Sequence, residues 1–119
     1  MARSQIVVTD IVRAGTAPIT QTTADSTNKH YFINSDGLVF LEIVSTDAGS
    51  QTVTVEASPT FTADGLTVSG LVITVAAGAT ALAGPFKVST FKQNSSYHVY
   101  VDPSVSTTLK FRAWRLPAT

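Results

Sequence analysis

Short runs of apolar residues, many of them alternating with polar residues, recur along the whole chain. Runs of this length, bounded by turn residues, predict β-strands. No window keeps the i, i+3, i+4, i+7 spacing of an amphipathic helix. The pattern therefore predicts an all-β fold, an antiparallel β-sandwich or barrel of about eight short strands with no long helix. The expected strands cover residues 5–12, 30–34, 38–45, 52–57, 71–76, 80–88, 97–101 and 107–116.

The segments between these runs contain the residues that tight turns need. Asn34-Ser35-Asp36-Gly37 precedes the third run, and Gly or Asp residues mark 47–50, 64–65 and 102–103. Glycine tolerates positive φ angles, and the Asp and Asn side chains accept hydrogen bonds from the backbone of a turn. These segments therefore set where the strands end.

Period-two alternation assigns faces to two of the strands. Val53 and Val55 alternate with hydroxyl and carboxylate side chains, which predicts one buried and one solvated face. The run 38–44 is apolar on both faces apart from Glu42, which predicts a central strand covered on both sides or a second buried contact. We interpret Glu42 as a rim carboxylate paired with a Lys or Arg.

The N-terminal part of the chain fits a sandwich least well. Residues 16–28 are rich in Thr, contain Pro18 and have few apolar positions, so we expect a long loop or an arm that orders on contact with a neighbour. By length, residues 1–119 form a single β domain. Within it, residues 1–28 are interpreted as a partly extended N-terminal strand and arm.

Charge and cysteine content exclude several partners. The eight basic and eight acidic side chains cancel, so the chain lacks the field that attracts nucleic acid or an anionic membrane. There is no cysteine for a disulfide or a thiolate metal site. Residues 65–86 carry no charge, but glycines, Pro85 and several threonines interrupt them, which favours two strands with a tight connection over a membrane helix. We expect no nucleic-acid or membrane partner.

The last strand carries the most informative surface pattern. Leu109, Phe111 and Ala113 alternate with Lys110, Arg112 and Trp114. Cations interleaved with an aromatic ring can bind single-stranded nucleic acid, but zero net charge favours a protein-contact anchor. A Trp tucked under a loop or at the sheet edge stays an open alternative. The predicted partner-binding residues are Arg3, Ile6, Arg13, Trp114 and Arg115.

Signatures of catalysis are missing from the sequence. The two histidines, His30 and His98, lie far apart and lack the spacing of a two-histidine metal site. There is no Gly-x-Ser-x-Gly elbow, phosphate-binding glycine loop or paired carboxylates on one strand face. We therefore predict that the chain is not an enzyme and uses no cofactor or metal.

The middle and C-terminal parts of the chain contain strand and turn segments at 38–43, 51–55, 64–66, 73–80, 84–86 and 109–113. These segments resemble the small β-rich head decoration (cement) proteins of tailed bacteriophages. The resemblance implies binding to the major capsid protein of an icosahedral head. It also implies a homo-oligomer on the outer surface of the virion head, made in the host cytoplasm. No residue role is carried over from that family, because the shared motifs are turns and strands.

Two other classes of binding protein remain open. A phage tail, fibre or baseplate module would share this composition and lack of chemistry. A carbohydrate-binding module would need a planar row of exposed aromatic rings, and the sequence places Tyr97 and Tyr100 on opposite faces of one predicted strand.

Overall fold

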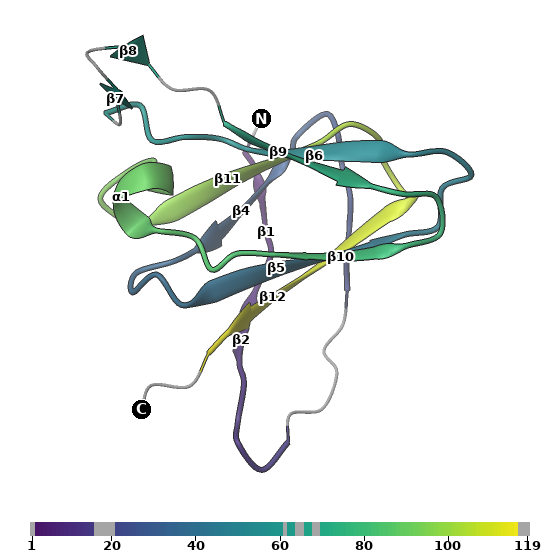
Figure 1. The fold of residues 1–119 in the computed structure, drawn as a ribbon, viewed down its shortest axis with the longest axis horizontal. Coiled ribbons are helices and arrows are strands. Elements are labelled where there is room, and N and C mark those ends of the chain that lie inside the picture. Colours follow the sequence, from purple (N-terminus) through teal and green to yellow (C-terminus); the bar gives the residue numbers. More distant parts are fainter. Residues whose placement is uncertain (1, 16–20, 61, 64–65, 68–69, 117–119) are drawn as a thin grey trace.

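Two β-sheets pack face to face in the computed structural model, which describes residues 2–15, 21–60, 62–63, 66–67 and 70–116 (Figure 1). The first sheet has the strand order β1 (Ser4–Gln5), β4 (His30–Ile33), β11 (His98–Pro103), β6 (Gln51–Val55) and β9 (Leu71–Val75). The second has the order β10 (Thr80–Ala83), β5 (Val39–Ser45), β12 (Leu109–Arg115) and β2 (Val8–Asp10), and β3 (Thr22–Thr23) also pairs with β12. A separate two-stranded sheet pairs β7 (Thr62–Ala63) with β8 (Leu66–Thr67) in antiparallel orientation.

The predicted all-β class and the sandwich are confirmed. The helix found in the described residues, α1 (Val88–Phe91), is a single turn of four residues. The sheets are mixed rather than purely antiparallel, because β1 runs parallel to β4 and β2 runs parallel to β12. All the other pairings are antiparallel.

The core lies between the sheets and follows the alternation in the sequence. On β5, Val39, Leu41 and Ile43 are buried while Phe40, Glu42 and Val44 are half-buried on the outer face. The predicted faces of β6 are also confirmed, with Val53 and Val55 inward. Burying such side chains is the main stabilising term, at about 1.5–3 kcal/mol for each large aliphatic or aromatic residue. The largest buried side chains are Phe32, Phe86 and Phe111.

The N-terminal segment is part of both sheets, which the sequence did not predict. Residues 5–12 were expected to form one strand, but the chain pairs with the first sheet through β1 and with the second through β2. Ile6 lies at this crossing with only 1% of its surface exposed, and its backbone N–H donates to the carbonyl of Tyr31. The crossing closes one side of the sandwich with an apolar side chain.

The predicted loop at residues 16–28 is partly a structural element. Residues 16–20 lie outside the described residues. Beyond them, β3 pairs with β12, Ala24 is buried, and Asp25 caps a turn by accepting hydrogen bonds from the backbone of Thr27 and Asn28. The part from 21 to 28 therefore packs on the domain and does not form an arm.

The charge-free segment contains the two expected strands, β9 and β10, but they belong to different sheets, and the segment also contains β8. β9 pairs with β6, and after a turn at residues 76–79 β10 pairs with β5. β10 ends at Ala83, before the predicted end at residue 88, because Gly84 has a positive φ angle and Pro85 has no N–H for a ladder. No helix among the residues described is long and apolar enough to span a bilayer.

Candidate functional site

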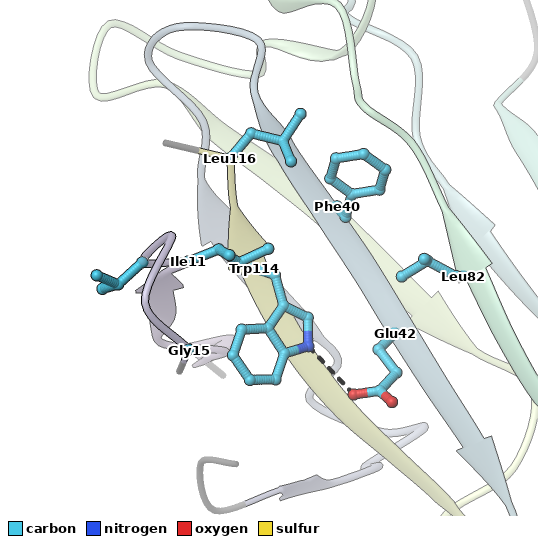
Figure 2. A pocket seen from close by; sticks show the side chains of 8 residues that line it. Ile11, Gly15, Phe40, Glu42, Leu82, Trp114 and Leu116 are labelled. Carbon is cyan, nitrogen blue, oxygen red and sulfur yellow. Dashed lines mark hydrogen bonds between the residues drawn. The ribbon is translucent and has the colours of Figure 1, made fainter. Parts of the chain in front are cut away.

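An apolar groove lies on the outer face of the second sheet (Figure 2). It has a volume of about 520 Å³. Its floor comes from β5 and β12, one side comes from β10, and the other comes from the segment that follows β2. The lining residues are Ile11, Val12, Gly15, Phe40, Glu42, Leu82, Trp114 and Leu116.

Strand register brings these side chains together. Trp114 of β12 lies directly opposite Phe40 of β5, and Glu42 lies between Leu82 of β10 and Arg112 of β12. Directly opposed residues of antiparallel strands point to the same face with Cβ atoms about 5 Å apart. The aromatic pair and the aliphatic side chain therefore form one contiguous apolar surface.

Glu42 holds the tryptophan in place. Its Oε1 atom accepts a hydrogen bond from Trp114 Nε1 at 3.2 Å (Figure 2). The same atom accepts a hydrogen bond from Arg112 Nη1 at 3.3 Å. The interpretation of Glu42 as a carboxylate paired with a basic residue is thus confirmed. With its N–H satisfied, the indole can present its apolar surface to the groove at little entropic cost on binding.

The groove leaves apolar side chains unusually open to solvent. Leu82 is 65% exposed, and Val12 is also exposed. The centres of protein interfaces are typically formed by a Trp or another aromatic residue among apolar neighbours. The half-buried Trp114 and the exposed aliphatic residues around it have this composition. The one ionisable lining residue, Glu42, is already paired with Arg112. The groove is therefore suited to hold an apolar side chain or loop of another protein.

The predicted partner-binding residues do not converge on one site. Trp114 lines the groove, and Arg13 is exposed in the turn after β2, next to the groove residue Val12. Arg115 lies at the end of β12, where it forms ion pairs with Asp36 and, at 3.4 Å, with Asp10. Ile6 belongs to the core. Its side chain offers no surface to a partner, which corrects its assignment as a contact residue.

Arg3 lies on the outer face of the first sheet, within a network of charges. Its guanidinium contacts Asp102 Oδ1 at 2.6 Å and Glu56 Oε2 at 2.8 Å, and it also donates to the carbonyl of His30. Lys29 Nζ lies 4.0 Å from the other oxygen of Asp102. The network links β11 to the N-terminal strand and satisfies the charged groups of this face internally.

The two carboxyl groups of this network titrate differently. The pKa of Glu56 is raised by its hydrogen bond to Asp102, by burial and by the negative charge of Asp102, against the opposing effect of Arg3. Burial alone would raise the pKa of Asp102, but hydrogen bonds from Glu56 and Arg3 and the nearby positive charges lower it. Asp102 is therefore the principal partner of Arg3.

The same face carries aromatic rings whose surfaces are partly occupied. Tyr31 stacks on His98 with ring centroids 4.1 Å apart, and the Arg3 guanidinium lies 3.9 Å above the ring of Tyr100. Tyr97 precedes β11 with a φ of +62°, and Lys92 Nζ lies 4.9 Å from its ring centroid. Tyr31, His98 and Tyr100 nevertheless line an open hollow of about 420 Å³ on this face, together with Ala2 and Arg3.

The histidines have different environments. His30 is buried against Phe111, its Nε2 atom accepts the backbone N–H of Asp25 at 2.9 Å, and burial lowers its pKa although Ser4 and Asp25 oppose this. His98 lies on the outer face of the first sheet, stacked on Tyr31. In the part of the chain that the structure describes, no three His, Cys, Asp or Glu residues come together as a potential metal site.

Sequence reasoning identified Trp114 and missed most of the groove. The continuous apolar pattern of 38–44 predicted that the outer face of β5 contacts something apolar. Phe40 is the residue on that face that lines the groove. Leu82 and Val12 gave no such signal, because each follows the ordinary pattern of a strand or loop. Only the order of strands in the sheet brings them together.

Comparison with known proteins adds no further information. No protein-family model, no curated protein and no solved structure matches the chain.

Proposed function

We propose that the chain is a non-enzymatic structural protein of a tailed bacteriophage virion, which binds the major capsid protein on the outer surface of the head. The observation that carries the binding role is the open apolar groove around Trp114. The resemblance of the strand and turn segments to head decoration proteins is what favours the capsid as partner.

In this proposal the groove receives an apolar side chain or loop of a capsid subunit. Leu82, Phe40 and Trp114 would lose their remaining water contact on binding, which contributes about 25 cal/mol for each Å² of apolar surface removed from solvent. Because the net charge is zero, we expect a weak dependence on salt compared with a phosphate-binding protein.

Stabilisation of the head would follow from linkage. A protein that binds only the assembled, expanded lattice lowers the free energy of that lattice relative to broken or unexpanded forms. Oligomers that contact several capsid subunits at once gain affinity by effective concentration, so each single contact can be weak.

The test is cosedimentation of the purified chain with undecorated expanded heads, with procapsids and with free capsid protein. We expect binding to expanded heads alone, little change between low and high salt, and no binding to DNA. The variant Leu82→Lys should bind at least tenfold more weakly, whereas Val7→Lys should bind as the wild type does. Leu82 and Val7 are equally exposed, at 65%, but Val7 does not line the groove.

Several results would reject the proposal. Equal binding to procapsids and expanded heads would indicate a general adhesive module, and binding to DNA without binding to heads would indicate a nucleic-acid partner. Labelled chain that is found on tails or fibres would favour the tail-module alternative. Binding to a glycan array that is lost in Tyr31→Ala would favour the carbohydrate alternative through the outer face of the first sheet.

A further inference from the structure

The edge strand β9 is open on one side. It pairs with β6 along its whole length, from Leu71 opposite Val55 to Val75 opposite Gln51. Among the described residues, no strand pairs with its other side. In an antiparallel edge strand, the backbone N–H and C=O groups of alternate residues point away from the sheet and can accept another strand.

β9 has exposed apolar side chains that an additional strand beside it would cover. Leu71, Ile73 and Val75 share one face, and Val75 is buried while Ile73 packs against the core. Leu71 is nevertheless 44% exposed. On the opposite face, Val72 is 58% exposed. Leu71 is thus an aliphatic side chain that faces the core and yet remains in contact with water. This exposure indicates that the core is incomplete at this edge.

This edge also lacks the features that usually prevent strand addition. Solvent-exposed edges are commonly protected by charged residues, prolines, bulges or very short strands. β9 has five residues, none of them charged or Pro, and it lies in the charge-free segment 65–86. At the other end of the first sheet, β1 has only two residues and Arg3 immediately precedes it.

We propose that two copies of the chain associate through β9, which pairs antiparallel with the β9 of the second copy about a two-fold axis. The occupant is a second copy because the strand complements itself. Pairing centred on Ile73 uses all five residues and keeps Leu71, Ile73 and Val75 of both copies on the core side. Leu71 then lies opposite Val75 of the second copy, and Val72 lies opposite Thr74. The two first sheets become one continuous sheet.

The pairing is closed, because a two-fold contact uses the same edge of both copies and leaves no further β9 to extend the assembly. The start of β9 lies against the end of β6. Gly70, just before β9, lies so close to β6 that a Cβ atom there would be 2.5 Å from the carbonyl oxygen of Val55. The inference goes beyond the proposed function, since it concerns contacts between copies and does not require a capsid. A dimer would present two grooves to a repeating surface.

The experiment is sedimentation equilibrium of the purified chain from about 1 to 500 μM, a range that brackets a micromolar dissociation constant. We expect a monomer of 12.5 kDa at low concentration and a dimer, without larger species, at high concentration. The double variant V72K/T74K places like charges opposite each other across the axis and should weaken association at least tenfold. V72K/T74E places opposite charges there and should restore it to within about threefold of the wild type.

Circular dichroism and thermal unfolding of both variants provide the folding control, because Val72 and Thr74 are exposed. A wild-type chain that is monomeric at every concentration would overturn the inference. Association that survives in V72K/T74K, or that fails equally in both double variants, would also overturn it, because neither result is compatible with this register. All these outcomes are independent of binding to heads, so failure of the capsid proposal would leave them unchanged.

Discussion

The outer faces of the two sheets both come from strands with alternating apolar and polar residues. They differ in whether their side chains find partners within the chain. On the first sheet, Arg3 pairs with Glu56 and Asp102, and Tyr31 stacks on His98. On the second sheet, one carboxylate holds Trp114 and the rest of the groove is apolar and open. The charges of the first face are paired within the chain, whereas the second face leaves an apolar groove open.

The comparison shows why a basic residue near an aromatic ring is a weak sign of a binding site. Arg3 over Tyr100 has the composition of an interface hot spot, yet its charge is neutralised by two carboxylates within the chain. Trp114 has a similar composition around it, but its neighbours Phe40 and Leu82 leave an apolar volume unfilled. Both faces have a hollow, of about 520 Å³ around Trp114 and of about 420 Å³ beside Arg3, Tyr31 and His98. The apolar lining of the groove on the second sheet, and not its volume, distinguishes the two faces.

The largest expected effect is on head binding by Trp114→Ala. We expect affinity to fall by about 100-fold, which corresponds to about 2.7 kcal/mol, because aromatic anchors carry most of the energy of an interface. Tyr31→Ala, on the other sheet, should change affinity less than threefold. Both are measured by cosedimentation with expanded heads. If Tyr31→Ala weakens binding more than Trp114→Ala does, the roles of the two faces are reversed.

The next effect concerns stability and should be confined to the first sheet. Arg3→Ala leaves Glu56 and Asp102 close together without their shared cation, and we expect it to lower the free energy of unfolding by about 2 kcal/mol. Arg115→Ala breaks more exposed ion pairs with Asp10 and Asp36 and should cost clearly less than Arg3→Ala does, because solvent screens exposed pairs. Urea unfolding of the two variants measures this order. Equal losses would show that the Arg3 network contributes no more than ordinary surface pairs.

A smaller effect, dependent on pH, is expected at His30. Burial lowers its pKa from 6.5, so the unfolded chain binds the proton more tightly. The stability due to neutral His30 is complete above pH 6.5 and is lost as the pH falls toward the lowered pKa. His30→Gln should cost about 1–2 kcal/mol at pH 7.5 and show less loss of stability between pH 7.5 and 5.5. Parallel slopes in both proteins would contradict this assignment.

The smallest effect is expected for Glu56→Gln. The folded pKa of Glu56 is raised, so the stability that its protonated form contributes is present at low pH and is lost as the pH rises through that pKa. The variant keeps a neutral side chain beside Asp102 at every pH. It should differ from the wild type by less than about 1 kcal/mol at pH 7, and its stability relative to the wild type should increase from pH 4 to pH 7. A relative decrease over that range would mean that the Arg3–Glu56 pair outweighs repulsion from Asp102.

The fold was largely predictable because alternation reports burial directly. The strands β5, β6 and β12 follow the apolar pattern residue by residue. The N-terminal crossing was not predictable, because Ile6, Val7 and Val8 are all apolar and their pattern does not show where the chain changes sheets. The parallel pairings of β1 and β2 have no local signal either, since their partners β4 and β12 lie far away in the sequence.

The candidate site was less predictable than the fold. Trp114 could be identified from its place in the alternation, but most of its neighbours in the groove come from three other parts of the chain. Arg3 and Ile6 were predicted as contact residues, and the structure places one in an ion-pair network and the other in the core. Partner residues across strands depend on register, which single-strand patterns do not contain.

The central claim is that the outer face of the second sheet, and not that of the first, contacts the partner. Hydroxyl-radical footprinting by mass spectrometry tests it directly, by comparing side-chain oxidation in the unbound chain and in the chain bound to expanded heads. We predict that oxidation of Trp114, Phe40 and Leu82 falls on binding while oxidation of Tyr31 and His98 is unchanged. Protection of Tyr31 and His98, with Trp114 oxidised equally in both states, would contradict the account.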